Sequence, residues 1–189
     1  MRKLIATINM TVDGFCDHTS MIADEEIHEH FSDTLRNASA VLYGRTAYHL
    51  MQSFWPTIVA KPSGTKTMDD FALAIDDVHK LVFSHTLKDT DPTITGWRNV
   101  RLAKRSLKDE VLELRGQSGK DIFAGSPSLI VQLTQLNLVD EYQLCVHPVI
   151  AGSGLPLFKN INDKGTLKLL KTKTFGSGAI MLYYQPIKK

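Results

Sequence analysis

The chain has 189 residues, 43% hydrophobic and 22% charged, which is an ordinary composition for one globular domain. Its 22 Lys and Arg residues nearly balance its 20 Asp and Glu residues, and the basic residues are scattered along the chain. This pattern argues against a nucleic-acid-binding protein, and no apolar stretch approaches the roughly 18 residues that a membrane helix needs.

The N-terminus, MRKLIATINM, lacks the long apolar core of a signal peptide. Cys16 and Cys145 show neither redox nor metal-binding spacing. These features predict a cytoplasmic protein with reduced cysteines, folded as a single domain over residues 1–189.

Short β-prone runs alternate with helical patterns in the first half of the chain. Strands are predicted at residues 4–8, 40–43 and 81–83. Asp24 is the predicted N-cap of a helix that carries Ile27, Phe31 and Leu35, and further helices are predicted at 46–51 and 67–78. An irregular stretch is expected to begin at Trp55-Pro56.

The second half continues the alternation and then changes to strands alone. Strands are predicted at 97–103, 122–124 and 142–150, with helices around 107–114 and at 128–138. Strands at 166–175 and 179–185 follow, joined by the turn Gly176-Ser177-Gly178. The order predicts an α/β domain of three layers: a mostly parallel mixed sheet with an antiparallel C-terminal hairpin, and helices on both faces.

Three predicted strand ends carry residues suited to an anionic ligand, and ligands of open α/β sheets bind beyond the carboxyl ends of the strands. In VLYGRTAY, Gly44 permits close backbone approach, while Arg45 and Thr46 offer a guanidinium group and a hydroxyl. Ser84 ends the strand in KLVFSHT. In KDIFAGSPSLI, Gly125 allows a tight turn, and Ser126 is a good N-cap for the next helix.

Each of these turns is also common as a simple connection between a strand and a helix, without any ligand. Their joint occurrence favours a phosphate-binding edge.

The chain resembles the dihydrofolate reductase superfamily in the order and spacing of five segments: TVDGF, YGRTAY, the strand ending in Ser84, AGSPSLI and DEYQLCVHPVIAGSGLPLF. Within it, the chain is most similar to the reductase domain at the C-terminus of the bacterial bifunctional riboflavin-biosynthesis deaminase-reductase, and to stand-alone relatives of that domain. The resemblance runs from Arg2 to Tyr184.

The resemblance implies a dihydrofolate reductase-like fold, a homodimer and NADPH as cofactor. It places four residues around the 2′-phosphate of the adenosine: Gly44, Arg45, Thr46 and Ser84. It places the pyrophosphate at the turn formed by Ala124, Gly125 and Ser126, where Ala124 replaces a family glycine. Ala6 would lie near the nicotinamide, covered by the loop around Asp13-Gly14.

The catalytic proton donor is less well defined. Asp24, in ADEEIHEHF, and Asp13 are the two candidates. Acids at a helix start also favour the helix dipole, and Asp-Gly is a common turn pair, so structural roles compete for both. His28 and His30 lie two apart on a helix and should point in different directions, so no metal site is predicted.

We therefore expect an NADPH-dependent reductase of a small heterocyclic substrate. It would be similar to 5-amino-6-(5-phosphoribosylamino)uracil reductase or to dihydrofolate reductase. The alternative is an NADPH- or nucleotide-binding protein of the same fold that has no turnover. Plain dihydrofolate reductase is disfavoured, because one alignment puts Ile27 where that enzyme has its acid.

Overall fold

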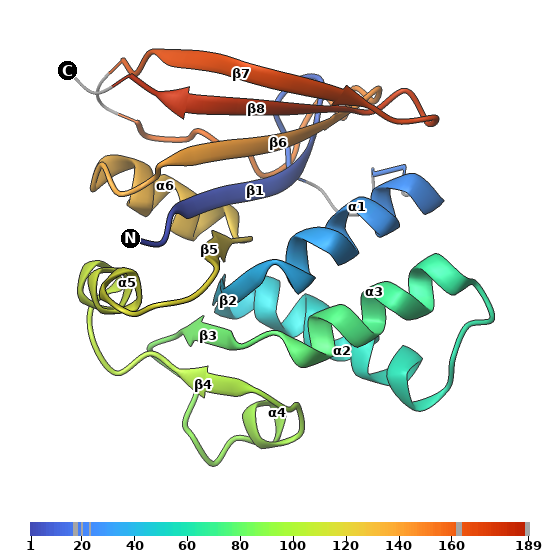
Figure 1. Ribbon diagram of the computed structural model, residues 1–189, viewed down its shortest axis with the longest axis vertical. Helices are drawn as coiled ribbons and strands as arrows, with labels where there is room; N and C mark the ends of the chain where they lie inside the picture. Colours follow the sequence, from blue (N-terminus) through green and yellow to red (C-terminus); the bar gives the residue numbers. More distant parts are fainter. Residues whose placement is uncertain (17–18, 20, 23, 162–163, 188–189) are drawn as a thin grey trace.

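The computed structural model describes residues 1–16, 19, 21–22, 24–161 and 164–187. An eight-stranded sheet runs through the molecule in the order β4-β3-β2-β5-β1-β6-β8-β7 (Figure 1). Its strands are β1 Leu4–Thr11, β2 Ala38–Gly44, β3 Lys80–Phe83, β4 Val100–Leu102, β5 Asp121–Ala124, β6 Glu141–His147, β7 Leu167–Thr174 and β8 Ile180–Pro186.

The sheet is parallel from β4 to β6, and β8 pairs antiparallel with both β6 and β7. The predicted mixed sheet with a C-terminal antiparallel hairpin is confirmed. Parallel pairing brings the carboxyl ends of β3, β2, β5, β1 and β6 to one edge of the sheet, hereafter the carboxyl edge. Their amino ends form the opposite, amino edge.

Helices cover both faces of the sheet, as the three-layer prediction requires. They are α1 Glu25–Arg36, α2 Arg45–Ala60, α3 Lys66–Asp77, α4 Pro92–Thr95, α5 Leu107–Gly116 and α6 Pro127–Gln135. Apolar residues of α5 and α6 pack on one face, and those of α1, α2 and α3 pack on the other. Strand alternation supplies both cores: Leu4 and Ala6 of β1 face α6, whereas Ile5 faces α1.

Helix α2 differs from the prediction, because it continues through Trp55-Pro56 to Ala60. Pro56 removes one backbone donor from the helix, a cost that packing offsets. The ring of Trp55 lies 4.4 Å from the ring of Phe71 on α3, between centroids. Tertiary contact thus stabilises a segment whose local sequence predicts irregular structure.

Two predicted strands are too long. β4 begins only at Val100, because Trp97 is buried and donates a 2.9 Å hydrogen bond to the Asp76 carboxylate of α3. β6 ends at His147, since the following Pro148 has no N–H for the ladder. Among the described residues, no helix is long and apolar enough to cross a membrane.

Candidate functional site

The three predicted phosphate-binding turns meet at the carboxyl edge. β2 lies between β3 and β5, with Gly44 opposite Phe83 and Leu42 opposite Ala124. The turns that follow these strands therefore lie side by side, although Gly44 is 40 positions from Ser84 and 81 positions from Gly125 in the chain.

Arg45 and Ser84 are brought together by a residue that the sequence did not single out. The Arg45 guanidinium donates to the Thr86 hydroxyl at 2.8 Å, and that oxygen lies 3.3 Å from the Ser84 hydroxyl. Ser84 also accepts from the backbone N–H groups of Thr86 and Leu87, at 3.2 and 3.1 Å. The Ser-His-Thr order, which is typical of an ST-turn, was the available signal for Thr86. Arg45 and Thr86 are both solvent-exposed, as is Thr46 in the first turn of α2.

Ser126 occupies the N-cap position of α6 but does not cap it with its side chain, contrary to the prediction. Its hydroxyl is buried and instead accepts from the backbone N–H of Gly44 at 2.8 Å. This bond ties the start of α6 to the start of α2, whose N-cap Gly44 also offers no side chain. Two neighbouring helices thus begin without side-chain caps, and uncapped N–H groups favour anions.

The two glycines at this edge face different neighbours. A Cβ at Gly125 would lie 3.1 Å from Cε1 of the buried Tyr43 ring. A Cβ at Gly44 would lie 3.2 Å from the hydroxyl oxygen of Ser128, which is exposed. Packing against Tyr43 therefore explains Gly125 without a ligand, whereas no rigid neighbour requires Gly44.

Ala6 and Ala124 are register partners at the centre of the sheet. Ala6 pairs with Ala124 of β5 on one side and with Tyr142 of β6 on the other. Both alanines are fully buried, and their methyl groups belong to the core beneath α5 and α6. Because these methyl groups point into the core, only the backbone of the two alanines could contact a cofactor. Their place beside the cofactor stays a prediction.

Asp13 fastens the AGSGLPLF loop to the end of β1. Its carboxylate accepts from the Thr11 hydroxyl at 2.6 Å and from the backbone N–H groups of Gly152 and Ala151 at 2.7 and 3.1 Å. The hydrogen bond from Thr11 is the main cause that lowers the pKa of Asp13 below its usual value. An ionised loop anchor is a poor source of protons near neutral pH.

Asp24 is the N-cap of α1, as predicted, and accepts from the Ile27 N–H at 2.7 Å. It also accepts from the backbone N–H of Ser177, in the turn between β7 and β8, at 2.9 Å. Burial alone would raise the pKa of Asp24, but the hydrogen bonds from Ser177 and Ile27 outweigh it and the pKa is lowered. The geometry thus favours structural roles for both candidate acids.

A polar row on β1 and β6 was missed by the sequence reasoning. The Nε2 atom of the buried His147 lies 2.9 Å from Oδ1 of Asn9, and its Nδ1 accepts from the Ile22 N–H at 3.3 Å. This pattern assigns the imidazole proton to Nε2, and burial lowers the pKa of His147. Thr7 lies two residues before Asn9 on the same face of β1. Its hydroxyl is buried and makes no hydrogen bond to any described residue.

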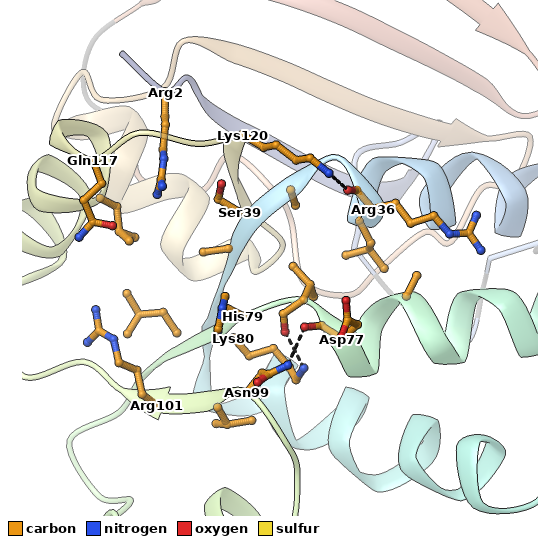
Figure 2. Close-up of a pocket in the computed structure, with 18 residues that line it drawn as sticks. Arg2, Arg36, Ser39, Asp77, His79, Lys80, Asn99, Arg101, Gln117 and Lys120 are labelled. Atoms are coloured by element: carbon orange, nitrogen blue, oxygen red, sulfur yellow. Dashed lines mark hydrogen bonds between the residues drawn. The ribbon is translucent and has the colours of Figure 1, made fainter.

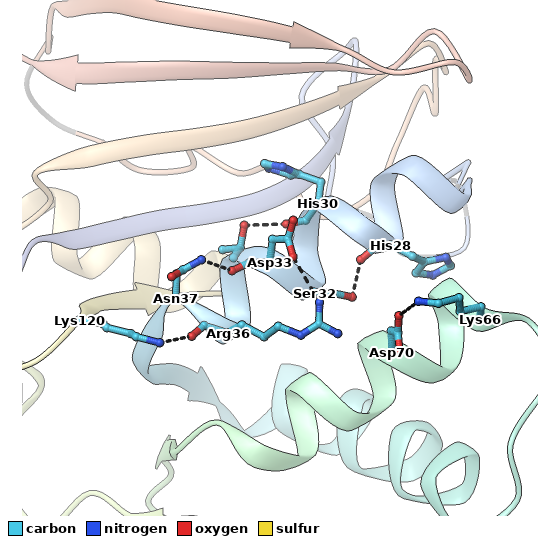
Figure 3. A network of polar contacts seen from close by, with 10 residues as sticks. His28, His30, Ser32, Asp33, Arg36, Asn37, Lys66, Asp70 and Lys120 are labelled. Carbon is cyan, nitrogen blue, oxygen red and sulfur yellow. Dashed lines mark hydrogen bonds and ion pairs between the residues drawn. The ribbon is translucent and has the colours of Figure 1, made fainter.

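His28 and His30 project from α1 toward different neighbours (Figure 3). The His28 ring lies near Trp55 of α2, with 6.2 Å between centroids. The His30 ring lies near Phe175 beyond β7, with 5.6 Å between centroids. The pair does not converge on one point, in keeping with its spacing.

Comparisons with known proteins identify the family of the chain. The family model of the RibD C-terminal domain matches residues 2–181. The uncharacterized protein YyaP of Bacillus subtilis is 31% identical over 187 residues, which cover 97% of this chain and 94% of YyaP.

Two solved structures share the fold. A putative riboflavin biosynthesis protein from Shewanella sp. PV-4 superposes with a TM-score of 0.74 at 16% identity, over 98% of this chain and 99% of that one. A diaminohydroxyphosphoribosylaminopyrimidine deaminase/5-amino-6-(5-phosphoribosylamino)uracil reductase from Thermotoga maritima superposes with a TM-score of 0.65 at 15% identity. The match covers 98% of this chain but 57% of that longer protein.

The dihydrofolate reductase-like architecture, the carboxyl-edge turns and the family match over residues 2–181 agree with one another. The chain belongs to the RibD C-terminal domain family.

Proposed function

We propose that the chain is an NADPH-dependent reductase of a small heterocyclic substrate. The observation that carries the proposal is the cluster of Arg45, Thr86 and Ser84 beside two helix starts without side-chain caps, all at one sheet edge. The cofactor would supply the hydride, so the protein has to bind and orient it next to an acceptor.

The chemistry of the cluster favours NADPH over NADH. A guanidinium group and two hydroxyls are donors for a 2′-phosphate, whereas NAD sites usually place a carboxylate against the ribose. Gly44 and Ser126, joined by a hydrogen bond, would bring the uncapped N–H groups of α2 and α6 to the pyrophosphate.

The polar row of Thr7, Asn9 and His147 supports a heterocyclic acceptor between β1 and α1. A buried hydroxyl without a partner is costly, and a polar ring edge that bonds to Thr7 would remove that cost. A pyrimidine or pterin-like ring offers such donors and acceptors on a flat apolar body. The uracil derivative named for the Thermotoga protein belongs to this class.

Arg45→Ala tests the proposal through cofactor choice. Loss of a charge-assisted contact to the 2′-phosphate should weaken NADPH binding roughly 10- to 100-fold and leave NADH binding nearly unchanged. Fluorescence titration measures both affinities, and Lys168→Ala, at an exposed lysine of β7, is the matched control. An equal loss for NADPH and NADH would remove the assigned role of Arg45.

The alternative is a protein that binds NADPH without turnover. Its support is that Asp13 and Asp24 are both ionised and engaged in structural hydrogen bonds. Absorbance loss at the NADPH band, followed with pyrimidine, pterin and flavin acceptors, separates the two functions. Binding without oxidation in every case would favour the alternative.

We also propose a cytoplasmic homodimer on the basis of the family resemblance. The free thiols of Cys16 and Cys145 suit a reducing compartment. Analytical ultracentrifugation would test the dimer, and a monomer at micromolar concentration would contradict it.

A further inference from the structure

A cavity of about 940 Å³ opens at the amino edge of the sheet, opposite the proposed cofactor site (Figure 2). The starts of β2, β3 and β4 line it, together with residues just before β1 and β5 and the ends of α1, α3 and α5. A volume of this size suits a small-molecule ligand.

Positive charge dominates the lining. Five cationic side chains contribute to it: Arg2, Arg36, Lys80, Arg101 and Lys120. Asp77 is the one carboxylate among the lining residues. Asp77 is itself ion-paired with Arg98. The cavity therefore carries an excess of positive charge.

Arg2 and Lys120 have no carboxylate partner within the described part of the chain. Arg2 donates through Nη2 to the Ser118 carbonyl, while its buried Nε makes no hydrogen bond to the residues that the structure describes. Lys120 uses one of its three N–H donors in a hydrogen bond to the Arg36 carbonyl at the end of α1. Both side chains retain donors for a ligand.

Gly119 makes room for the Arg2 guanidinium. A Cβ at this position would lie 2.5 Å from Nη2 of Arg2 and 2.9 Å from the Ser39 hydroxyl, and its φ of +136° also disfavours a side chain. The absence of a side chain at Gly119 thus leaves space for Arg2, which precedes β1 and points toward the cavity (Figure 2).

The three remaining cationic side chains already have partners within the protein. Lys80 donates to three carbonyls at the end of α3 and is buried, so it forms the wall rather than a ligand contact. Arg101 and Arg36 are ion-paired with Glu110 and Asp33, and their side chains are 51% and 48% exposed. They add positive potential at the rim.

We propose that this amino-edge cavity binds a phosphorylated small molecule, with Arg2 and Lys120 as its phosphate ligands. The Nη1 group of Arg2 and two N–H groups of Lys120 make no hydrogen bond to the described residues, and guanidinium and ammonium groups bind phosphate oxygens. The hydroxyl and amide groups of Ser39, Asn99 and Gln117 line the same cavity. The site is separate from the carboxyl edge and does not depend on NADPH binding there.

Titration with inorganic pyrophosphate tests the site on the whole chain. Backbone amide NMR shifts are expected at Ser39, Asn99 and Gln117. Calorimetry should show binding that weakens at least about tenfold in Arg2→Gln/Lys120→Gln. Lys168→Gln, an exposed lysine on β7, is the control and should bind as the wild type does. A second titration with adenosine 5′-diphosphate tells whether an organic group adds affinity.

Shifts confined to residues 44–46, 84–86 and 125–128 would overturn the proposal, because they would place the anion at the carboxyl edge alone. Unchanged affinity in the double variant would overturn it as well. If the double variant does not fold, the amide NMR shifts of the wild-type protein still show whether pyrophosphate binds at the amino edge. Equal affinity for pyrophosphate and the nucleotide, with shifts at the amino edge, would identify the phosphate groups as the whole recognition element.

Discussion

The two glycines of the carboxyl edge should respond very differently to the same added methyl group. In Gly125→Ala, the new Cβ would approach Tyr43 Cε1 to 3.1 Å, and the Tyr43 ring is only 3% exposed and unable to move aside. Overpacking of this kind costs about 1–3 kcal/mol of unfolding free energy. We expect Gly125→Ala to lower stability within that range.

Gly44→Ala should leave stability almost unchanged. Gly44 has φ −77° and ψ 160°, which any residue adopts, and its new Cβ would meet the exposed Ser128 hydroxyl, which can rotate. The expected change is within about 0.5 kcal/mol, since alanine also reduces the entropy of the unfolded chain. NADPH binding, in contrast, should weaken, because the methyl group would stand where the pyrophosphate is proposed to lie.

Urea unfolding of both variants, followed by circular dichroism, measures the stabilities, and fluorescence titration measures NADPH affinity. The m-values should match the wild type, so that midpoints report stability directly. Equal destabilisation by the two substitutions would refute the steric reasoning. Wild-type NADPH affinity in Gly44→Ala would refute the proposed cofactor position.

Three further predictions concern side chains that accept hydrogen bonds from the backbone. Glu110→Ala should cost about 1–3 kcal/mol, because the backbone N–H groups of Lys104 and Arg105 lose the buried carboxylate that accepts from them; thermal unfolding measures this. Burial raises the Glu110 pKa, but the Arg101 hydrogen bond and other contacts outweigh it. Because the Glu110 pKa is lowered in the folded state, its stabilisation is fully present above the ordinary carboxyl pKa. The stabilisation is lost as pH falls through the lowered pKa. Glu110→Ala should not show this loss of stability in acid. Asp24→Ala should cost about 1–2 kcal/mol in urea unfolding through loss of the α1 cap; no change would contradict the structural role. Ser126→Ala should cost about 1–3 kcal/mol by the same measurement, since it leaves the buried Gly44 N–H without its acceptor, and a neutral result would count against that hydrogen bond.

Local sequence was sufficient for the order of the strands and of the longer helices, but it did not predict the short helix α4. Runs such as the one at 81–83 and the cap at Asp24 depend on neighbours within a few residues, and the structure confirms them. Where the prediction failed, distant contacts decided. Trp55 continues α2 by packing on Phe71, and Trp97 shortens β4 by bonding to Asp76.

The fold class and the segments that form the carboxyl edge could be predicted from the amino-acid sequence, because each strand end carries its own Gly, Ser or Arg signal. The contacts that these residues make depend on segments far away in the chain. Ser126 bonds to Gly44, 82 positions away, and His147 bonds to Asn9, 138 positions away. The amino-edge cavity likewise gathers Arg2 and Lys120 from opposite parts of the chain. Parallel pairing aligns strands that are distant in sequence, and no local pattern records which side chains then meet.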